Sequence, residues 1–160
     1  MALTLKALNA VIADFNYWGE SEGDSPLKLS RTKSLVDEKR ILSYDASMRL
    51  AAHQGDTTYK VPASRTVQTK TLQEVFTPLV TNALAEVSSR AETIADEGIE
   101  SLEMSAEALE FYTQLYSAFN QSTNPKVCYV HAGNDPEVGL MIVGENTGET
   151  IVAKTLLIQT

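Results

Sequence analysis

The stretch Lys126–Thr160 reads KVCYVHAGNDPEVGLMIVGENTGETIVAKTLLIQT, in which three apolar runs alternate with two turn-forming clusters. The runs are rich in β-branched residues and the clusters in Gly, Asn and Asp, which favours strands over helix. We expect strands near residues 126–132, 137–144 and 150–159. Connections this short predict antiparallel pairing, because a parallel return needs a crossover of about a dozen residues. Thr160 directly follows the last expected strand, so the sheet is expected to hold this end of the chain in place.

The second and third apolar runs are almost continuous rather than alternating. Such runs are typical of strands that are buried on both faces, so helices must cover the sheet from both sides. Apolar residues recur at helical spacing near residues 4–17, 78–97 and 102–120. The sequence therefore predicts the α/β class, as an α-β-α sandwich with a mainly antiparallel sheet, in a single domain of residues 1–160.

Local signals predict where the helices begin and end. Thr4 is a candidate N-cap, and Gly19 a candidate stop, for the first helix. Thr77-Pro78 offers an N-cap and a first-position proline for the second helix, and Gly98 is expected to end it. Shorter elements are expected elsewhere: a strand at Leu27–Ser30, a helix at residues 45–53 capped by Asp45, and extended segments within residues 58–69 interrupted by Pro62.

The charge and the hydropathy of the chain argue against nucleic-acid-binding and membrane-spanning proteins. The formal net charge of the 160 residues is −8. Residues 1–70 hold ten Lys and Arg against eight Asp and Glu, whereas residues 71–160 hold three against thirteen. An acidic surface repels phosphates, which argues against direct nucleic-acid binding, and it attracts basic proteins. The apolar stretches are shorter than a membrane span and no basic-then-apolar leader opens the chain, so we expect a cytoplasmic protein without membrane contact.

Few residues form the patterns of a catalytic or metal site. The sequence has neither common phosphate-binding glycine loop and no G-x-S-x-G, and Cys128 is expected to be a buried thiol. His53 with Asp56, and His131 with Asp135, each match half of a metal site, but two-residue matches are frequent by chance. The sequence thus predicts a protein that is not an enzyme and uses no cofactor or metal. An enzyme or ligand binder with a pocket near His131 is the weaker alternative.

The segment GESEGDSP, residues 19–26, holds Glu20, Glu22 and Asp24 at alternating positions. Its glycines and its proline predict a polar loop. Three carboxylates this close could remain solvated, hold a hard cation such as Ca²⁺, or project toward a basic partner. The loop lacks the length and the ligand pattern of an EF-hand.

Taken together, the two ends of the chain resemble the family of the cyanobacterial nuclease A inhibitor. The resemblance is carried by NPKVCYV and MIVGENTGETIVAKTLLIQT, with Asn124-Pro125 before a strand, Gly144-Glu145 at a turn and Thr160 closing the last strand. Upstream, the opening helix and the acidic loop are similar to those of the family. The further residues that match are Glu20-Ser21-Glu22 and Pro26 in that loop, and Tyr59-Lys60-Val61 at the family's middle strand.

This resemblance implies an α-β-α sandwich that inhibits a sugar-non-specific DNA/RNA endonuclease, one-to-one, by occupying its active site. It also implies that Glu20 and Thr160 reach the metal-containing centre of the nuclease. Because Glu22 and Asp24 flank Glu20 in the acidic loop, we expect them to contact the partner as well. A carboxylate can imitate the phosphate that such a centre binds near Mg²⁺.

The chain departs from the family in its centre. An Asp-Trp contact of the family is missing there, since the single tryptophan of this chain is Trp18, and a long helical stretch, Thr77–Glu100, stands in its place. Loss of a central aromatic anchor weakens binding to the original partner. The alternative function is therefore an acidic protein-protein interaction module of the same fold with a non-nuclease partner.

Overall fold

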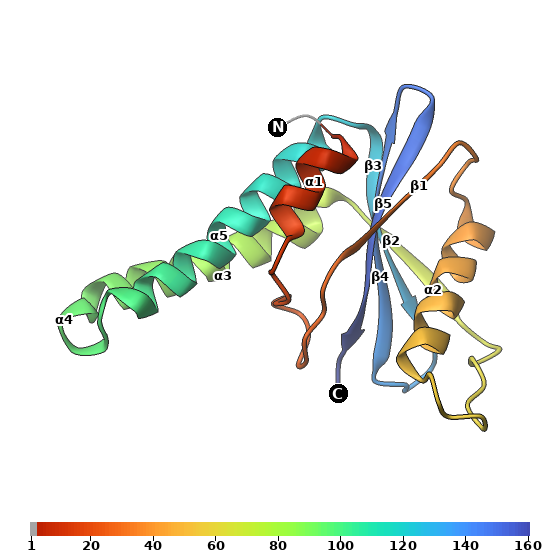
Figure 1. Ribbon diagram of the computed structural model, residues 1–160, viewed down its shortest axis with the longest axis horizontal. Coiled ribbons are helices and arrows are strands. Elements are labelled where there is room, and N and C mark those ends of the chain that lie inside the picture. The colour runs from red at the N-terminus through yellow and green to blue at the C-terminus, as the bar shows by residue number, and fades with distance from the viewer. Residues whose placement is uncertain (1–2) are drawn as a thin grey trace.

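The computed structural model describes residues 3–160, which form a five-stranded antiparallel sheet and five helices (Figure 1). This confirms the predicted α/β class. Across the sheet the strand order is β1-β5-β4-β3-β2. Along the chain the elements are α1 (Leu5–Ile12), β1 (Lys28–Thr32), α2 (Glu38–Ala52), β2 (Thr66–Lys70), α3 (Leu72–Glu92), α4 (Ile94–Glu97), α5 (Ile99–Asn120), β3 (Thr123–His131), β4 (Glu137–Asn146) and β5 (Glu149–Ile158).

The last three strands form the central meander of the sheet. Val127 pairs with Ile142 between β3 and β4, and Val143 pairs with Val152 between β4 and β5. Gly148 has a φ of 79° in the tight β4–β5 turn, a conformation that glycine adopts without steric cost. The three strands predicted from Lys126–Thr160 are confirmed. The two edges come from earlier in the chain, because β1 pairs with β5 and β2 pairs with β3.

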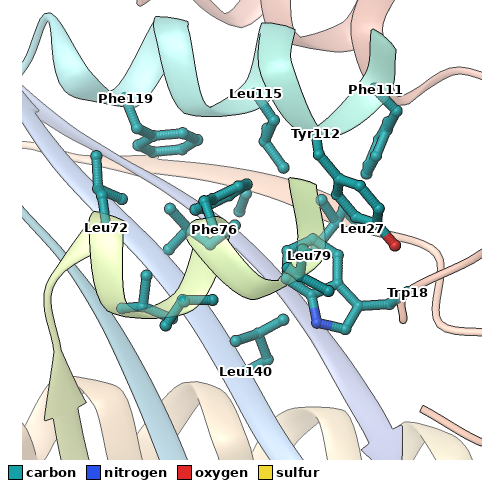
Figure 2. Close-up of a cluster of buried hydrophobic side chains, with 14 of the residues drawn as sticks. Trp18, Leu27, Leu72, Phe76, Leu79, Phe111, Tyr112, Leu115, Phe119 and Leu140 are labelled. Carbon is teal, nitrogen blue, oxygen red and sulfur yellow. The ribbon is translucent and has the colours of Figure 1, made fainter. Parts of the chain in front are cut away.

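One face of the sheet packs against α1, α3 and α5. Side chains of β3, β4 and β5 alternate in direction, and Tyr129, Leu140 and Ile142 point to this face. Figure 2 shows how Trp18 from the loop after α1 enters the same cluster beside Phe76 and Leu140. The rings of Trp18 and Phe76 meet edge to face with centroids 5.9 Å apart. Fully buried aromatic side chains of this size contribute much of the hydrophobic stabilisation of a core.

The opposite face packs against α2. Cys128, Met141 and Val152 point to this side, where Ile41 of α2 covers them. Burial raises the pKa of the Cys128 thiol, as expected for a cysteine that acts as a small apolar residue. The continuous apolar runs of the sequence thus correspond to strands covered on both faces, and the predicted α-β-α arrangement is present.

Several predicted helix boundaries are wrong. The first helix does begin after its N-cap, Thr4, but it ends at Ile12, and Asp14 with a φ of 60° turns the chain well before Gly19. The helix assigned to residues 45–53 begins earlier, with Asp37 as its N-cap, so Asp45 lies in its middle. Residues 59–61 are not a strand; the extended segment between residues 58 and 69 is β2.

The long helix α3 does not begin at Thr77-Pro78. Its N-cap is Thr71, whose side chain accepts a hydrogen bond from the backbone N–H of Glu74, while the Glu74 carboxylate accepts one from the Thr71 N–H. This capping box satisfies two backbone donors at the helix start and overrides the proline signal. The helix α3 ends at Glu92, earlier than predicted; Gly98 instead ends the short helix α4, where a φ of 84° turns the chain into α5.

The helices α3 and α5 form an antiparallel hairpin whose outer part extends away from the sheet (Figure 1). Only the half near the sheet contributes buried side chains. Of the residues that the structure describes, none from Leu84 to Glu110 is buried. Across residues 3–160, no helix combines the length and the apolar character needed to cross a membrane.

Candidate functional site

The acidic loop lies against the end of β5 and is fixed there by hydrogen bonds. The backbone N–H of Glu22 donates to the carbonyl of Ile158 at 2.8 Å, and the Ile158 N–H donates to Ser21 Oγ at 3.0 Å. Ser25 is buried and its hydroxyl donates to the carbonyl of Leu156. In Figure 1 the C-terminal end of the chain accordingly lies near the loop that joins α1 to β1. The loop and the last strand therefore form one surface.

Glu20 connects this surface to the core. Its Oε1 atom accepts a hydrogen bond from the Trp18 indole N–H at 2.9 Å and another from the Tyr129 hydroxyl at 2.7 Å. Burial, and secondarily the neighbouring Glu20 carboxylate, raise the pKa of Tyr129, so its hydroxyl remains a donor at neutral pH. The Glu20 backbone carbonyl also accepts from the Gln159 side chain at 3.1 Å. The half-buried Glu20 side chain is held in one orientation by these contacts.

Glu22 and Thr160, both exposed, contact each other directly. The Thr160 hydroxyl lies 2.8 Å from Oε1 and 2.7 Å from Oε2 of Glu22, and the Thr160 N–H donates to Oε2 at 3.1 Å. Asp24 is exposed and turns toward α2, where it lines a surface cleft with Lys28 and Lys154. The structure thus brings Glu22 and Thr160 together, with Glu20 on the adjoining segment. The carboxylates of Glu20 and Glu22 thus have different partners, and Asp24 lies in the cleft beside α2.

The sequence offers Asp56 as a companion of His53, whereas in the structure the partner of His53 is Glu137. His53 Nε2 lies 2.7 Å from Glu137 Oε1, and its ring stacks on Tyr59 with centroids 3.7 Å apart and planes within 4°. Burial, and secondarily the nearby Glu137 carboxylate, raise the pKa of Tyr59. The nearby Asp56 instead accepts hydrogen bonds from Thr58.

A buried charge network lies beside this histidine. Asp45 and Arg49 on α2 are completely buried, and Asp45 Oδ2 accepts hydrogen bonds from Arg49 Nε at 2.9 Å and from Arg65 Nη1 at 2.7 Å. The second terminal nitrogen of Arg49, Nη2, donates to the carbonyls of Val130 and Glu137. A buried charge is tolerated only when it is paired and hydrogen-bonded. The network therefore ties α2 and the 53–66 segment to the adjacent ends of β3 and β4.

Three polar atoms of this region have no hydrogen-bond partner: Asp45 Oδ1, Arg49 Nη1 and Tyr59 Oη. Arg49 Nη1 nevertheless faces Asp135 Oδ2 at 3.7 Å. Gly139 on β4 makes room for Asp45, because a Cβ at this glycine would come closer than 3.0 Å to Asp45 Oδ1.

The Asp45 network was not predicted from the sequence. The spacing of Asp45 and Arg49, four residues apart on a helix, was a signal that could have suggested an ion pair. Nothing local indicated that this pair would be buried, because the burial depends on Arg65 and Gly139, which are distant in sequence.

These groups define what each region can do chemically. His53 and Glu137 form a close pair of the residue types used in general acid–base chemistry, with 32% and 14% of their side chains exposed. Across the described residues, no group of three or more His, Cys, Asp or Glu side chains is placed to hold a metal ion. The loop with Thr160 presents carboxylates and a hydroxyl toward solvent, which suits contact with a cationic surface.

Comparisons of the chain with models of protein families, with characterised proteins and with solved structures find no match. The resemblance to the nuclease A inhibitor family therefore depends on the short stretches of sequence named under Sequence analysis. Among these, Glu22 and Thr160 lie in contact, whereas Tyr59-Lys60-Val61 does not form the expected strand.

Proposed function

We propose that the protein is an inhibitor that binds the active site of a sugar-non-specific DNA/RNA endonuclease, one-to-one, with its acidic loop and Thr160. One observation carries the proposal: residues 138 positions apart in sequence, Glu22 and Thr160, form a single exposed surface next to Glu20. The site of such a nuclease is built to hold phosphate near a divalent cation, and carboxylates can take the place of that phosphate. The expected cytoplasmic location remains part of this proposal.

Pre-organisation supports the role proposed for Glu20. Its Oε1 atom is held by two donors, which leaves Oε2 to meet a partner without loss of side-chain freedom on binding. Glu22 is fixed in turn by Thr160. Because the protein would act by occupying a site, we propose that it has no catalytic activity of its own.

The test is a titration of a magnesium-dependent, sugar-non-specific endonuclease with the wild-type protein and charge-neutral variants. Glu20→Gln preserves an oxygen that can accept from Trp18 and Tyr129 but removes the charge. We expect it to weaken inhibition about tenfold or more, the loss typical of one charged contact at an interface. Thr160→Ala should weaken inhibition less, because it frees Glu22 without removing a charge. Glu149→Gln, at the opposite end of β5, is the matched control and should inhibit like wild type.

If the wild type inhibits the nuclease and Glu20→Gln and Glu22→Gln inhibit it equally well, this surface is not the contact. Absence of inhibition of any such nuclease would favour the alternative, an acidic interaction module with a non-nuclease partner. The projecting α3–α5 hairpin specifically favours that alternative, because the resemblance offers no counterpart to it (Figure 1).

A further inference from the structure

A groove runs along the inner side of the α3–α5 hairpin, next to the segment that follows α1. Its volume is about 720 Å³. Leu79 and Ala83 of α3 and Ala108 of α5 line it with apolar surface, and Met104 on α5 extends this lining outward. Met104 is 72% exposed, which is unusual for a large apolar side chain that borders a hollow. Leu79 and Ala83 are themselves buried and form the floor of the groove, so the apolar surface that the described chain leaves uncovered is that of Met104 and of the half-buried Ala108.

The outer part of the hairpin has little packing of its own. Between Leu84 and Glu110 the best covered apolar side chains, such as Val87 and Leu102, are only half-buried. At the tip, Ile99 is 71% exposed. Helices in proteins obtain most of their stability from the burial of an apolar face. Large apolar side chains that stay exposed on a helical hairpin, as Ile99 and Met104 do, are characteristic of a surface that binds another element.

The charge of the hairpin indicates what kind of element would fit. Residues 71–120 hold nine of the 21 Asp and Glu residues and one of the 13 Lys and Arg residues, so their net charge of −8 equals that of the whole chain. The single cation, Arg90, is paired with Glu86 and Glu97. The hydrogen bond from Arg90 lowers the pKa of Glu97, so Glu97 stays charged at neutral pH. The rim of the groove, which includes Glu20, Glu86 and Glu107, is therefore acidic without a free cation.

We propose that this groove binds a basic amphipathic helix of a protein partner, with the apolar face of that helix on Met104 and Ala108. Recognition of a helix in a groove combines apolar anchors with complementary charges at the rim. A second copy of this chain is a poorer fit, because two hairpins of charge −8 repel each other. Phosphate-bearing ligands and anionic membranes are repelled for the same reason. The surface shares only Gly19 and Glu20 with the proposed nuclease contact and does not depend on the partner being a nuclease.

The probe is a fluorescein-labelled peptide of about 18 residues, or five helical turns, made of Leu and Lys with the leucines on one helical face. One control peptide has the same composition in a scrambled order that breaks the apolar face, and another carries Glu in place of Lys. Binding is measured by fluorescence anisotropy at two salt concentrations on the full chain. We expect the amphipathic peptide to bind at least about tenfold more tightly than the scrambled one, which corresponds to about 1.4 kcal/mol. The acidic peptide should not bind.

Matched variants locate the site. Met104→Asn should weaken binding of the amphipathic peptide about tenfold, whereas Leu84→Asn, also on the hairpin and exposed but outside the groove, should not. Glu107→Gln should weaken peptide binding mainly at low salt. Glu103 does not line the groove, so Glu103→Gln should weaken peptide binding less than Glu107→Gln does. Circular dichroism of each variant checks that the hairpin remains folded.

Equal binding of the ordered and scrambled peptides, or no effect of Met104→Asn, would overturn the proposal, since attraction would then come from charge alone. Sedimentation that shows dimers of the wild type but not of Met104→Asn would instead identify a second copy as the occupant and would also overturn it. Thr160→Ala should leave peptide binding intact. This outcome separates the groove from the proposed nuclease contact, so either proposal can fail while the other stands.

Discussion

Adding one methyl group at Gly139 tests the buried Asp45 network directly. The Cβ of Gly139→Ala would lie closer than 3.0 Å to Asp45 Oδ1 and 3.2 Å from its Cγ, while carbon and oxygen atoms normally approach to about 3.3 Å. Asp45 would have to retreat by on the order of 1 Å. It cannot do so without lengthening its hydrogen bonds to Arg49 and Arg65, which now measure 2.9 and 2.7 Å.

The expected cost is large because Arg49 is completely buried and would lose its counter-charge. Overfilling a packed site typically costs about 1–3 kcal/mol. Removing one partner of a buried ion pair costs about 3–5 kcal/mol. One displacement causes both effects, so the two ranges do not add, and we expect Gly139→Ala to lower the free energy of unfolding by about 3–5 kcal/mol. A domain with a total stability of about 5–15 kcal/mol would remain folded or become marginal.

Urea unfolding followed by circular dichroism measures this change. Gly23→Ala is the matched control, because its Cβ would meet Ile158 at an ordinary 3.6 Å; it should stay within about 0.5 kcal/mol of wild type. In a protein that already carries Asp45→Ala, Gly139→Ala should lower the free energy of unfolding hardly at all. A double-mutant cycle measures this difference as a coupling energy between the two positions. A cost below about 1 kcal/mol, or costs of the two changes that simply add, would refute the argument.

Three further predictions concern stability. Burial raises the pKa of Tyr112 and of Tyr129 above the value of about 10 for unfolded tyrosine. The contribution of these two groups to the free energy of unfolding should therefore be constant below about pH 10 and fall above it, by about 1.4 kcal/mol per pH unit for each group. Urea titrations should show a shallower fall for Tyr129→Phe; an unchanged slope would contradict the assignment. Leu157→Ala should lower the free energy of unfolding by about 2–5 kcal/mol because Leu157 is fully buried. Leu156→Ala should lower it clearly less because Leu156 is half-buried. Equal losses of stability in thermal unfolding would disprove this ranking. Thr71→Ala should cost about 1 kcal/mol through loss of the capping box, whereas Thr77→Ala, inside α3, should be nearly neutral in the same measurement.

The central strands could be predicted because their signals are local. In KVCYV every residue is apolar apart from the first, and the structure sends alternate side chains, such as Cys128 and Tyr129, to opposite covered faces. The start of α3 could not be predicted with equal ease, since two local signals competed. Thr77-Pro78 matched a cap followed by proline, but the apolar stripe already begins at Leu72, and burial of that stripe determined the helix start.

The candidate site was predictable only in part. The residues of the acidic loop were visible as a pattern, whereas the contact of Glu22 with Thr160 depends on β5 ending beside that loop. The Asp45–Arg49 pair was visible as spacing but not as a buried pair. Both omissions have the same physical origin: the environment of a charge is set by segments far away in sequence, and no local pattern reports it.

The two proposed surfaces differ in how rigid they are before a partner binds. Glu20 is held by Trp18 and Tyr129, both part of the main hydrophobic core, so the acidic loop is ordered by the fold itself. The outer hairpin has no buried side chain between Leu84 and Glu110, so a partner would supply the apolar contacts that order it fully. Binding to a pre-organised surface loses little conformational entropy, whereas binding that orders a segment loses more and reaches lower affinity for the same contact area. The loop is therefore the better site for tight inhibition, and the hairpin the better site for reversible docking.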